Sequence, residues 1–192
     1  MQQNIVDDVL SFSKLDAAML SLAPKPSEPN RQLANALKMF QPELRKQGIE
    51  FDYCVDTSYV SYDIRWVMAD LTRIGQVLVN LVTNGIKFTA RKDGEKRLTV
   101  SVGASMERPT SYPPNVIYFN ADDTAYRMDA TNTSEWGNGE VLFIMVAVKD
   151  TGIGISDEGQ KRLFERFRQA TPKTEEMYGG SGLGLSKYID GS

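Results

Sequence analysis

The stretch "DLTRIGQVLVNLVTNGIKFT" at residues 70–89 carries the strongest helical pattern in the sequence. Its apolar residues recur every three or four positions from Leu71 to Ile86, as on the buried face of an α-helix. Asp70 stands directly before the first of them, where an N-cap is expected. On the other side, polar side chains fall within an arc of roughly 80° at 100° per residue. They are Arg73, Gln76, Asn80, Asn84 and Lys87.

Two interpretations of this polar arc remain open from the helix alone. Most amphipathic helices have a solvated face, but such a face usually favours Glu and Lys. Asn80 and Asn84, stacked one turn apart, are poor helix formers with no local reason to be there. An amide oxygen with Lys87 one turn on suits a hydrated Mg²⁺ and a polyphosphate. Phe88, at the edge of the apolar stripe, suits packing against a base.

The segments on either side alternate between helical and strand patterns. Residues 4–20 show a helical stripe, and the proline-rich residues 21–30 indicate a linker or boundary. A second helix is expected from Leu33 to Leu44, kinked or divided by Pro42 and ended by Gly48. Strands are expected at residues 49–55, 65–69, 97–104 and 141–148, and a short helix at 158–164. The last strand should be covered on both faces, because its apolar run is continuous.

Residues 107–139 are rich in Pro, Asn, Asp, Thr and Ser and show no period. We expect them to form an inserted loop, mobile and outside the core.

Composition narrows the classes of function. A net charge of −3 without a dense basic block argues against a nucleic-acid partner. No apolar run approaches the roughly 20 residues of a membrane span, and the N-terminus has no signal-peptide pattern. The single cysteine excludes an internal disulfide framework and fits a reducing, cytoplasmic compartment. The chain has no histidine, which excludes every mechanism that needs an imidazole of its own.

The segment "VAVKDTGIGIS" places Asp150 at the end of a buried strand, followed by Gly152 and Gly154. An ordinary strand-to-helix turn contains the same residue types. A binding site would use a buried carboxylate that accepts a hydrogen bond from an adenine amino group. The glycines would then let the backbone approach the flat base. The motif by itself does not decide between the two.

The octet "GGSGLGLS" at residues 179–186 is either a flexible surface turn or a cradle for phosphates. It is not a Walker A loop, because Leu185 rather than Lys follows its last glycine, and it lacks the glycine spacing of a dinucleotide fingerprint. Ser181 is suited to cap a helix that starts at Gly182. The unpaired amides and positive dipole end of that helix would face an anion.

Together and in this order, the motifs closely resemble the ATP-binding catalytic domain of sensor histidine kinases, within the gyrase B, chaperone, kinase and MutL ATPase superfamily. The resemblance covers about residues 31–188, and the segment after the F box is most similar to the lids of fungal hybrid histidine kinases. The matching motifs are the N box "NLVTNGIKF", the first glycine box "DTGIGI", the F box "LFERF" and the second glycine box "GGSGLGLS".

This resemblance implies an α/β fold, a two-layer Bergerat-type sandwich in which a mixed sheet carries helices on one face. Residues 31–192 would be the catalytic domain, with the insertion at 107–139. Residues 1–22 would be the second helix of a dimerisation and phosphotransfer region, and residues 23–30 the linker.

The resemblance also implies roles for particular residues. Asn84 would hold Mg²⁺, with Asn80 supporting the metal and phosphates. Lys87 would reach the phosphates, and Phe88 would pack near the adenine and ribose. Asp150 would bind the adenine amino group. The other implied ATP-binding residues are Gly152 and Gly154 near the base, and Gly180, Gly182, Leu183, Gly184 and Leu185 near the phosphates, with residues 166–180 as a mobile lid.

The implied activity is that of a protein histidine kinase in a two-component system. Mg·ATP would donate its γ-phosphoryl group to a histidine outside this chain, with Asn84 and Lys87 contributing to catalysis, and a receiver-domain aspartate would then take it. The implied partners are ATP, a histidine-bearing phosphotransfer helix, a response-regulator receiver domain and, in the full-length protein, a second copy of the chain. The alternatives are a non-catalytic nucleotide-binding module and a chaperone- or gyrase-type ATPase.

Three features depart from the family pattern. Gly85 stands where alanine is usual, which costs a helix about 1 kcal/mol, and Ser186 stands where an aliphatic or aromatic residue is common. The sequence stops at "YIDGS", before the rest of the last helix and the final strand, and it lacks the first phosphotransfer helix. We therefore expect a fragment that leaves apolar sheet surface uncovered.

Overall fold

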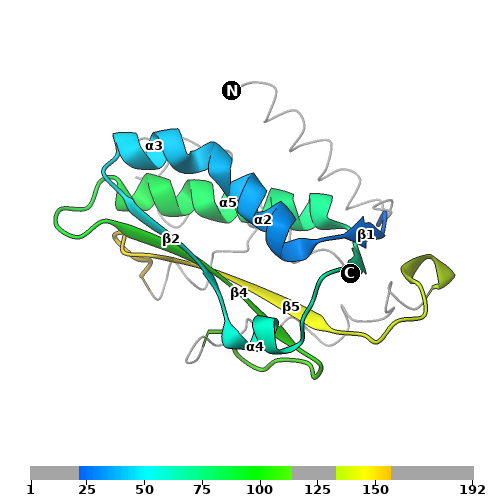
Figure 1. Ribbon diagram of the computed structural model, residues 1–192. Helices are drawn as coiled ribbons and strands as arrows, with labels where there is room; N and C mark the ends of the chain where they lie inside the picture. Colours follow the sequence, from blue (N-terminus) through cyan, green and yellow to red (C-terminus); the bar gives the residue numbers. More distant parts are fainter. Residues whose placement is uncertain (1–21, 114–132, 157–192) are drawn as a thin grey trace. The chain divides into compact units, whose positions relative to one another are not determined.

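The computed structural model describes residues 22–113 and 133–156 (Figure 1). Apart from Leu22 and Gly154–Ser156, which belong to a second unit, these residues lie in one compact unit. The helices expected at 4–20 and 158–164, the lid and the glycine octet lie outside the described residues. Among the described helices, none has the length and apolar character that a bilayer crossing requires.

A three-stranded mixed sheet forms the centre of this unit, in the order β2-β4-β5. β2 (Glu50–Val55) runs parallel to β4 (Arg97–Ser105), and β4 runs antiparallel to β5 (Phe143–Asp150). A parallel pair needs a crossover connection, and the chain between β2 and β4 supplies it with the long helix α5 (Leu71–Thr89). The strands expected at 49–55 and 97–104 are confirmed within one residue.

A separate two-stranded sheet pairs β1 (Lys25–Ser27) with β3 (Val67–Ala69) in antiparallel register. The strand expected at 65–69 is therefore shorter than predicted and lies outside the main sheet. Residues 23–30, the expected linker, contain β1 and the beginning of the next helix.

The helices follow the sequence signals closely. Asp70 caps α5 as expected, since its Oδ1 accepts the backbone N–H of Arg73 at 3.3 Å. The second predicted helix is divided, as Pro42 indicated, into α2 (Pro29–Leu37), a 3-10 turn (Lys38–Phe40) and α3 (Gln41–Lys46), and Gly48 follows with a φ of 64°. The short helix α4 (Thr57–Ser61) and a 3-10 turn (Ser134–Trp136) were not predicted.

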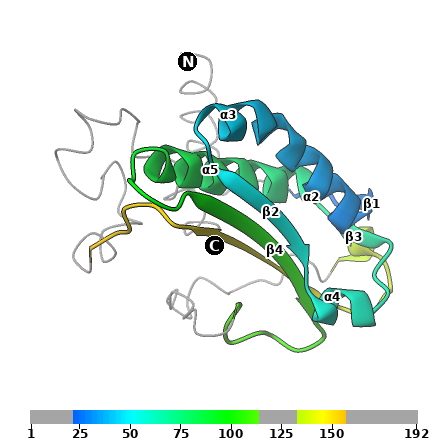
Figure 2. The ribbon, with the colours of Figure 1, turned by 60° about the vertical axis from the view of Figure 1, so that its left-hand side comes forward.

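The core lies between the sheet and the helices on one of its faces. Figures 1 and 2 show α2, α3 and α5 on the same side of the sheet. Alternate residues of β4 point to that side, so Leu98, Val100 and Val102 are each 0% exposed. Full burial of such a side chain contributes about 1.5–3 kcal/mol. The α5 residues that pack against them are Leu78, Val82 and Ile86.

The last strand runs from Phe143 to Asp150 instead of the expected 141–148, and the expectation that both of its faces are covered fails at the start of the apolar run. Of its apolar run, Ile144, Val146 and Val148 pack against the core. In contrast, Val141 is 66% and Phe143 is 36% exposed. Met145 and Ala147, on the other face, are half-buried, and within the described residues β5 lies at one edge of the sheet.

The two described ends of the expected insertion at 107–139 lie against the unit. The ring of Tyr112 lies over Gly103 of β4, so close that a Cβ at Gly103 would come within 2.6 Å of Tyr112 Cε2. At the other end, Gly137 lies beside Met68 of β3. The middle of the insertion, 114–132, lies outside the described residues.

Candidate functional site

The two sides of α5 differ as the sequence predicts. Asn80, Asn84, Lys87 and Phe88 are half-buried. The residues that face the sheet are buried, and they include Leu78, Val82, Gly85, Ile86 and Thr89. The predicted polar stripe therefore lies along the part of α5 that the sheet does not cover.

Gly85 explains how α5 comes close to the end of β5. A Cβ at Gly85 would lie 2.6 Å from Leu98 Cδ1 and 3.7 Å from the Cβ of Asp150. Leu98, fully buried on β4, fills the space that an alanine methyl group would need. The departure from the family's usual alanine is thus matched by a neighbouring side chain.

Gly152 makes the second contact between the two predicted motifs. A Cβ at this position would lie 3.0 Å from the carbonyl carbon and 3.1 Å from the carbonyl oxygen of Phe88. The turn after β5 therefore rests directly on the backbone of the last turn of α5. The structure brings the N box and the first glycine box together at this point.

Asp150 is exposed, which corrects the expectation of a buried carboxylate. It is the last residue of β5 and continues the row of Ile144, Val146 and Val148 that faces the helices. Its neighbour on α5 is Gly85, which has no side chain to cover it. Its Oδ1 accepts the backbone N–H of Gly152 at 2.8 Å, so the carboxylate is oriented although it remains accessible.

Lys87 is the basic residue in the last turn of α5. Burial lowers the pKa of this ammonium group, and the positive charge of Arg91 one turn on lowers it further. The Lys87 Nζ lies 5.5 Å from the centroid of the Phe88 ring, within range of a cation–π interaction. A bound polyphosphate would compensate this partly desolvated cation.

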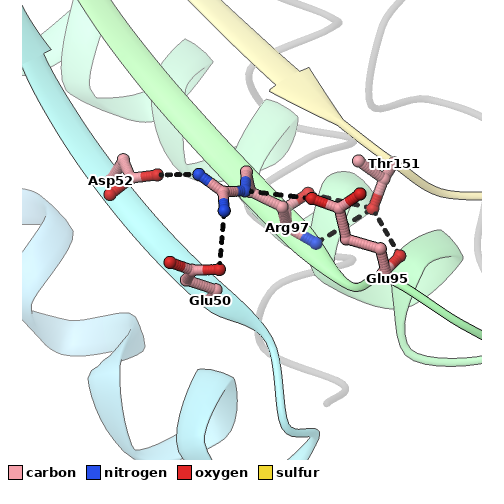
Figure 3. A network of polar contacts seen from close by, with 5 residues as sticks. All are labelled: Glu50, Asp52, Glu95, Arg97 and Thr151. Atoms are coloured by element: carbon pink, nitrogen blue, oxygen red, sulfur yellow. Dashed lines mark hydrogen bonds and ion pairs between the residues drawn. The ribbon is translucent and has the colours of Figure 1, made fainter.

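A network of ion pairs and hydrogen bonds that the sequence did not reveal lies where β4 begins and β5 ends (Figure 3). Arg97, at the start of β4, forms ion pairs with Glu50 and Asp52 of β2 and with Glu95. The hydroxyl of Thr151, directly after Asp150, accepts the backbone N–H of Arg97 and donates to the carbonyl of Glu95. The spacing of these residues along the chain gave no signal, because only the register of β4 with β2 on one side and with β5 on the other brings them together.

The remaining predicted residues are Gly154 and five residues of the glycine octet. Gly154 has a φ of 69°, a left-handed conformation that favours glycine, and it belongs to the second unit. Gly180, Gly182, Leu183, Gly184 and Leu185 lie outside the described residues. Within the described ranges, no group of three or more His, Cys, Asp or Glu side chains is placed to hold a metal ion.

Comparison with known proteins points to the family that the motifs suggested. The pattern of the family "Histidine kinase-, DNA gyrase B-, and HSP90-like ATPase" matches residues 69–187, more than half of the chain. The chain is 30% identical over 183 residues to Histidine protein kinase 1 of Candida albicans, covering 95% of this chain and 6% of that protein. It is 27% identical over 204 residues to Histidine kinase 2 of Arabidopsis thaliana, covering 95% and 17%. The chain thus spans a small part of these relatives.

Solved structures show the same fold. Full-length ShkA in complex with AMPPNP is 24% identical, with a TM-score of 0.63, and the match covers 97% of this chain and 29% of ShkA. The catalytic domain of the histidine kinase ThkA is 22% identical, with a TM-score of 0.51, covering 88% of this chain and 77% of that domain. With an α/β fold, a mixed sheet and the matched motifs, the chain belongs to the histidine kinase-, DNA gyrase B- and HSP90-like ATPase family.

Proposed function

We propose that this chain is the ATP-binding catalytic part of a two-component histidine kinase. The observation that carries the proposal is the contact between the polar side of α5 and the end of β5, where Gly152 rests on the backbone of Phe88. This contact gathers an amide, a cation, an aromatic ring and a carboxylate in one region. The ShkA structure, which holds the ATP analogue AMPPNP, supports a nucleotide as the ligand.

In this proposal the adenine lies at the end of β5. The Oδ1 of Asp150 is engaged by the Gly152 N–H at 2.8 Å, and we assign its Oδ2 to the adenine amino group. We also assign Gly152 and Gly154 to the neighbourhood of the base, and Phe88 to packing near the base and ribose. Lys87 reaches the phosphates, and the octet at 179–186 supplies backbone amides to them.

The residues on α5 also fit Mg²⁺. This ion prefers oxygen ligands and usually keeps several waters, with one or two protein groups and substrate phosphates completing its shell. The amide oxygens of Asn84 and Asn80 suit such a partial shell, and the described residues contain no cluster of carboxylates that would hold the metal without a nucleotide. When bound, the metal would neutralise charge on the phosphates.

The proposed reaction is transfer of the γ-phosphoryl group to a histidine of another polypeptide segment, since this chain has none. The bond between the γ-phosphorus and its bridging oxygen breaks, a bond to an imidazole nitrogen forms, ADP leaves and the imidazole loses a proton. Such transfer depends mainly on positioning and charge stabilisation, which Lys87 and Asn84 provide. A receiver-domain aspartate, a homodimeric full-length protein and a cytoplasmic location complete the proposal.

Calorimetric titration of ATP, with and without Mg²⁺, tests the site. We expect Asn84→Ala to remove the part of the affinity that depends on Mg²⁺, while Thr83→Ala, exposed and about 100° around the helix, leaves it unchanged. Asp150→Asn removes a charge-assisted hydrogen bond, so ATP affinity should fall roughly 10- to 150-fold. Unchanged affinity in both site variants would contradict the assignment.

Radiolabelled ATP tests the reaction. The chain alone should not form acid-labile phosphohistidine, whereas addition of a histidine-bearing helical hairpin should give acid-labile label on that hairpin. Acid-stable label on the chain would indicate a different kinase chemistry. ATP binding without any transfer to the hairpin would favour a non-catalytic nucleotide-binding module.

A further inference from the structure

The ladder between β4 and β5 ends in an irregular way at Thr151. In a regular hydrogen-bonded antiparallel pair, two residues exchange two backbone bonds. The backbone N–H of Thr151 donates to the carbonyl of Arg97 at 3.0 Å. The N–H of Arg97, however, donates to the side-chain hydroxyl of Thr151 at 2.9 Å. The hydroxyl thus takes the place of a backbone carbonyl, and the chain is released from the sheet after this residue.

The same hydroxyl is also anchored as a donor. It donates to the carbonyl of Glu95 at 2.9 Å, with a longer contact of 3.4 Å to the carbonyl of Arg97. Figure 3 shows it between the backbone of Glu95 and that of Arg97. A single side chain therefore ties the end of β5 to the entry of β4 in both hydrogen-bonding directions.

The entry of β4 is itself held by the ion pairs of Arg97. Its Nη2 lies 2.8 Å from Glu50 Oε2 and its Nη1 lies 3.2 Å from Asp52 Oδ2. Its Nε lies 3.3 Å from Glu95 Oε1, a charge contact without hydrogen-bond alignment. These groups are partly exposed, so each pair contributes little stability. Their geometric effect is to join β2, β4 and residue 95 around the point where Thr151 bonds.

Thr151 stands between the two residues that shape the candidate adenine site. On one side is Asp150, and on the other is Gly152, whose N–H holds Asp150 Oδ1 and whose backbone rests on Phe88. With Thr151 fixed to β4 and Gly152 fixed to α5, the carboxylate of Asp150, which accepts the Gly152 N–H, has one preferred orientation.

We propose that Thr151 is a positioning residue for nucleotide recognition: its hydroxyl ends β5 so that Asp150 presents its second oxygen to the amino group of the base. This inference rests on the proposed function and adds to it the residue that makes the site selective for an adenine over a base without that amino group. Thr151 does not touch the nucleotide in this scheme.

The test is the ratio of affinities for ATP and inosine triphosphate, which lacks the amino group, measured for the wild type and three variants. Thr151→Val keeps the shape but loses the hydroxyl, and Thr151→Ser keeps the hydroxyl. Thr99→Val is the matched control, because Thr99 lies two residues from Arg97 on the same strand and face.

We expect Thr151→Val to weaken ATP binding about tenfold and to change inosine triphosphate binding less than about twofold. Thr151→Ser and Thr99→Val should keep the wild-type preference. An equal loss for both nucleotides would show a merely structural role, and an unchanged preference in Thr151→Val would also overturn the proposal. If the wild type binds neither nucleotide, the proposed function itself fails, which is a different outcome.

Discussion

The two sides of β4 are held in different ways. Leu98, Val100 and Val102 face the helices and are completely buried, so this side is stabilised by apolar contact that has no preferred direction. Arg97 and Thr99 face the other side and are half-exposed. At Arg97, where β4 begins, directional hydrogen bonds and ion pairs set the positions of the neighbouring strands. We infer that the side of β4 that faces the helices provides most of the stability. The polar contacts of Arg97 provide the geometry of the candidate site.

The largest expected effect is a loss of stability on the side of β4 that faces the helices. Leu98→Ala removes a fully buried side chain and should lower the free energy of unfolding by about 2–5 kcal/mol. Ser101→Ala, on the other side of β4, should change it by no more than about 0.5 kcal/mol. Urea denaturation measures both. Equal losses in the two variants would contradict the difference between the sides.

The second largest effect is expected at Gly152, where the turn after β5 contacts the backbone of α5. Gly152→Ala would press a methyl group against the Phe88 carbonyl and the Asp150 carboxylate, at 3.1 and 2.6 Å. Overpacking of this kind costs about 1–3 kcal/mol, and the displaced carboxylate should weaken ATP binding as well. Gly139→Ala, where a Cβ has open space around it, is the control. Wild-type stability and ATP affinity in Gly152→Ala would show that the contact is unimportant.

Much of the fold could be predicted from the sequence because its signals are local. The 3.6-residue period, the Asp70 cap, Pro42 and Gly48 each act within one turn of helix, and each is found where expected. The pairing of β1 with β3 and the edge position of β5 depend on contacts between distant segments. The alternation of apolar and polar residues within one strand does not show which strand it pairs with or whether it lies at the edge of the sheet.

The candidate site also has features that local signals predict and features that depend on contacts between distant segments. Its residue types were recognisable from the motifs, and the structure places Phe88 beside Gly152. The exposure of Asp150 was not predictable, since it depends on contacts with other elements, and its neighbour on α5 is a glycine without a side chain. The role of Thr151 depends on its register with Arg97, which appears only when the strands are paired.

Tyr53 permits a test of the helix side by pH. Its hydroxyl donates to Asn30 Oδ1 at 2.8 Å, and burial, with smaller contributions from Tyr59 and Tyr112, raises its pKa to about 12. The unfolded value is about 10, so the folded state holds this proton more tightly. Its stabilising contribution is complete below the unfolded pKa and is lost as pH rises toward the folded pKa.

We therefore expect the free energy of unfolding to fall by about 1–2 kcal/mol across this alkaline range, since the half-buried hydroxyl still meets some solvent. Tyr53→Phe should cost about 1 kcal/mol at neutral pH through the lost hydrogen bond and should lack this part of the decline. Tyr62→Phe, at a residue that is 47% exposed, should keep it. An unchanged alkaline decline in Tyr53→Phe would exclude the assignment.

The smallest expected effect is the uptake of a fraction of a proton by Lys87, in the last turn of α5, when ATP binds. Burial and the neighbouring Arg91 lower the pKa of Lys87, so in alkaline solution part of the free protein carries it as a neutral amine. A bound polyphosphate favours the ammonium form and raises this pKa again. ATP binding should then take up protons, which calorimetry detects as a dependence of the binding enthalpy on the ionisation enthalpy of the buffer. Lys87→Arg keeps a permanent positive charge, so it should bind ATP without this uptake. Equal proton uptake in the wild type and in Lys87→Arg would mean that Lys87 does not meet the phosphates.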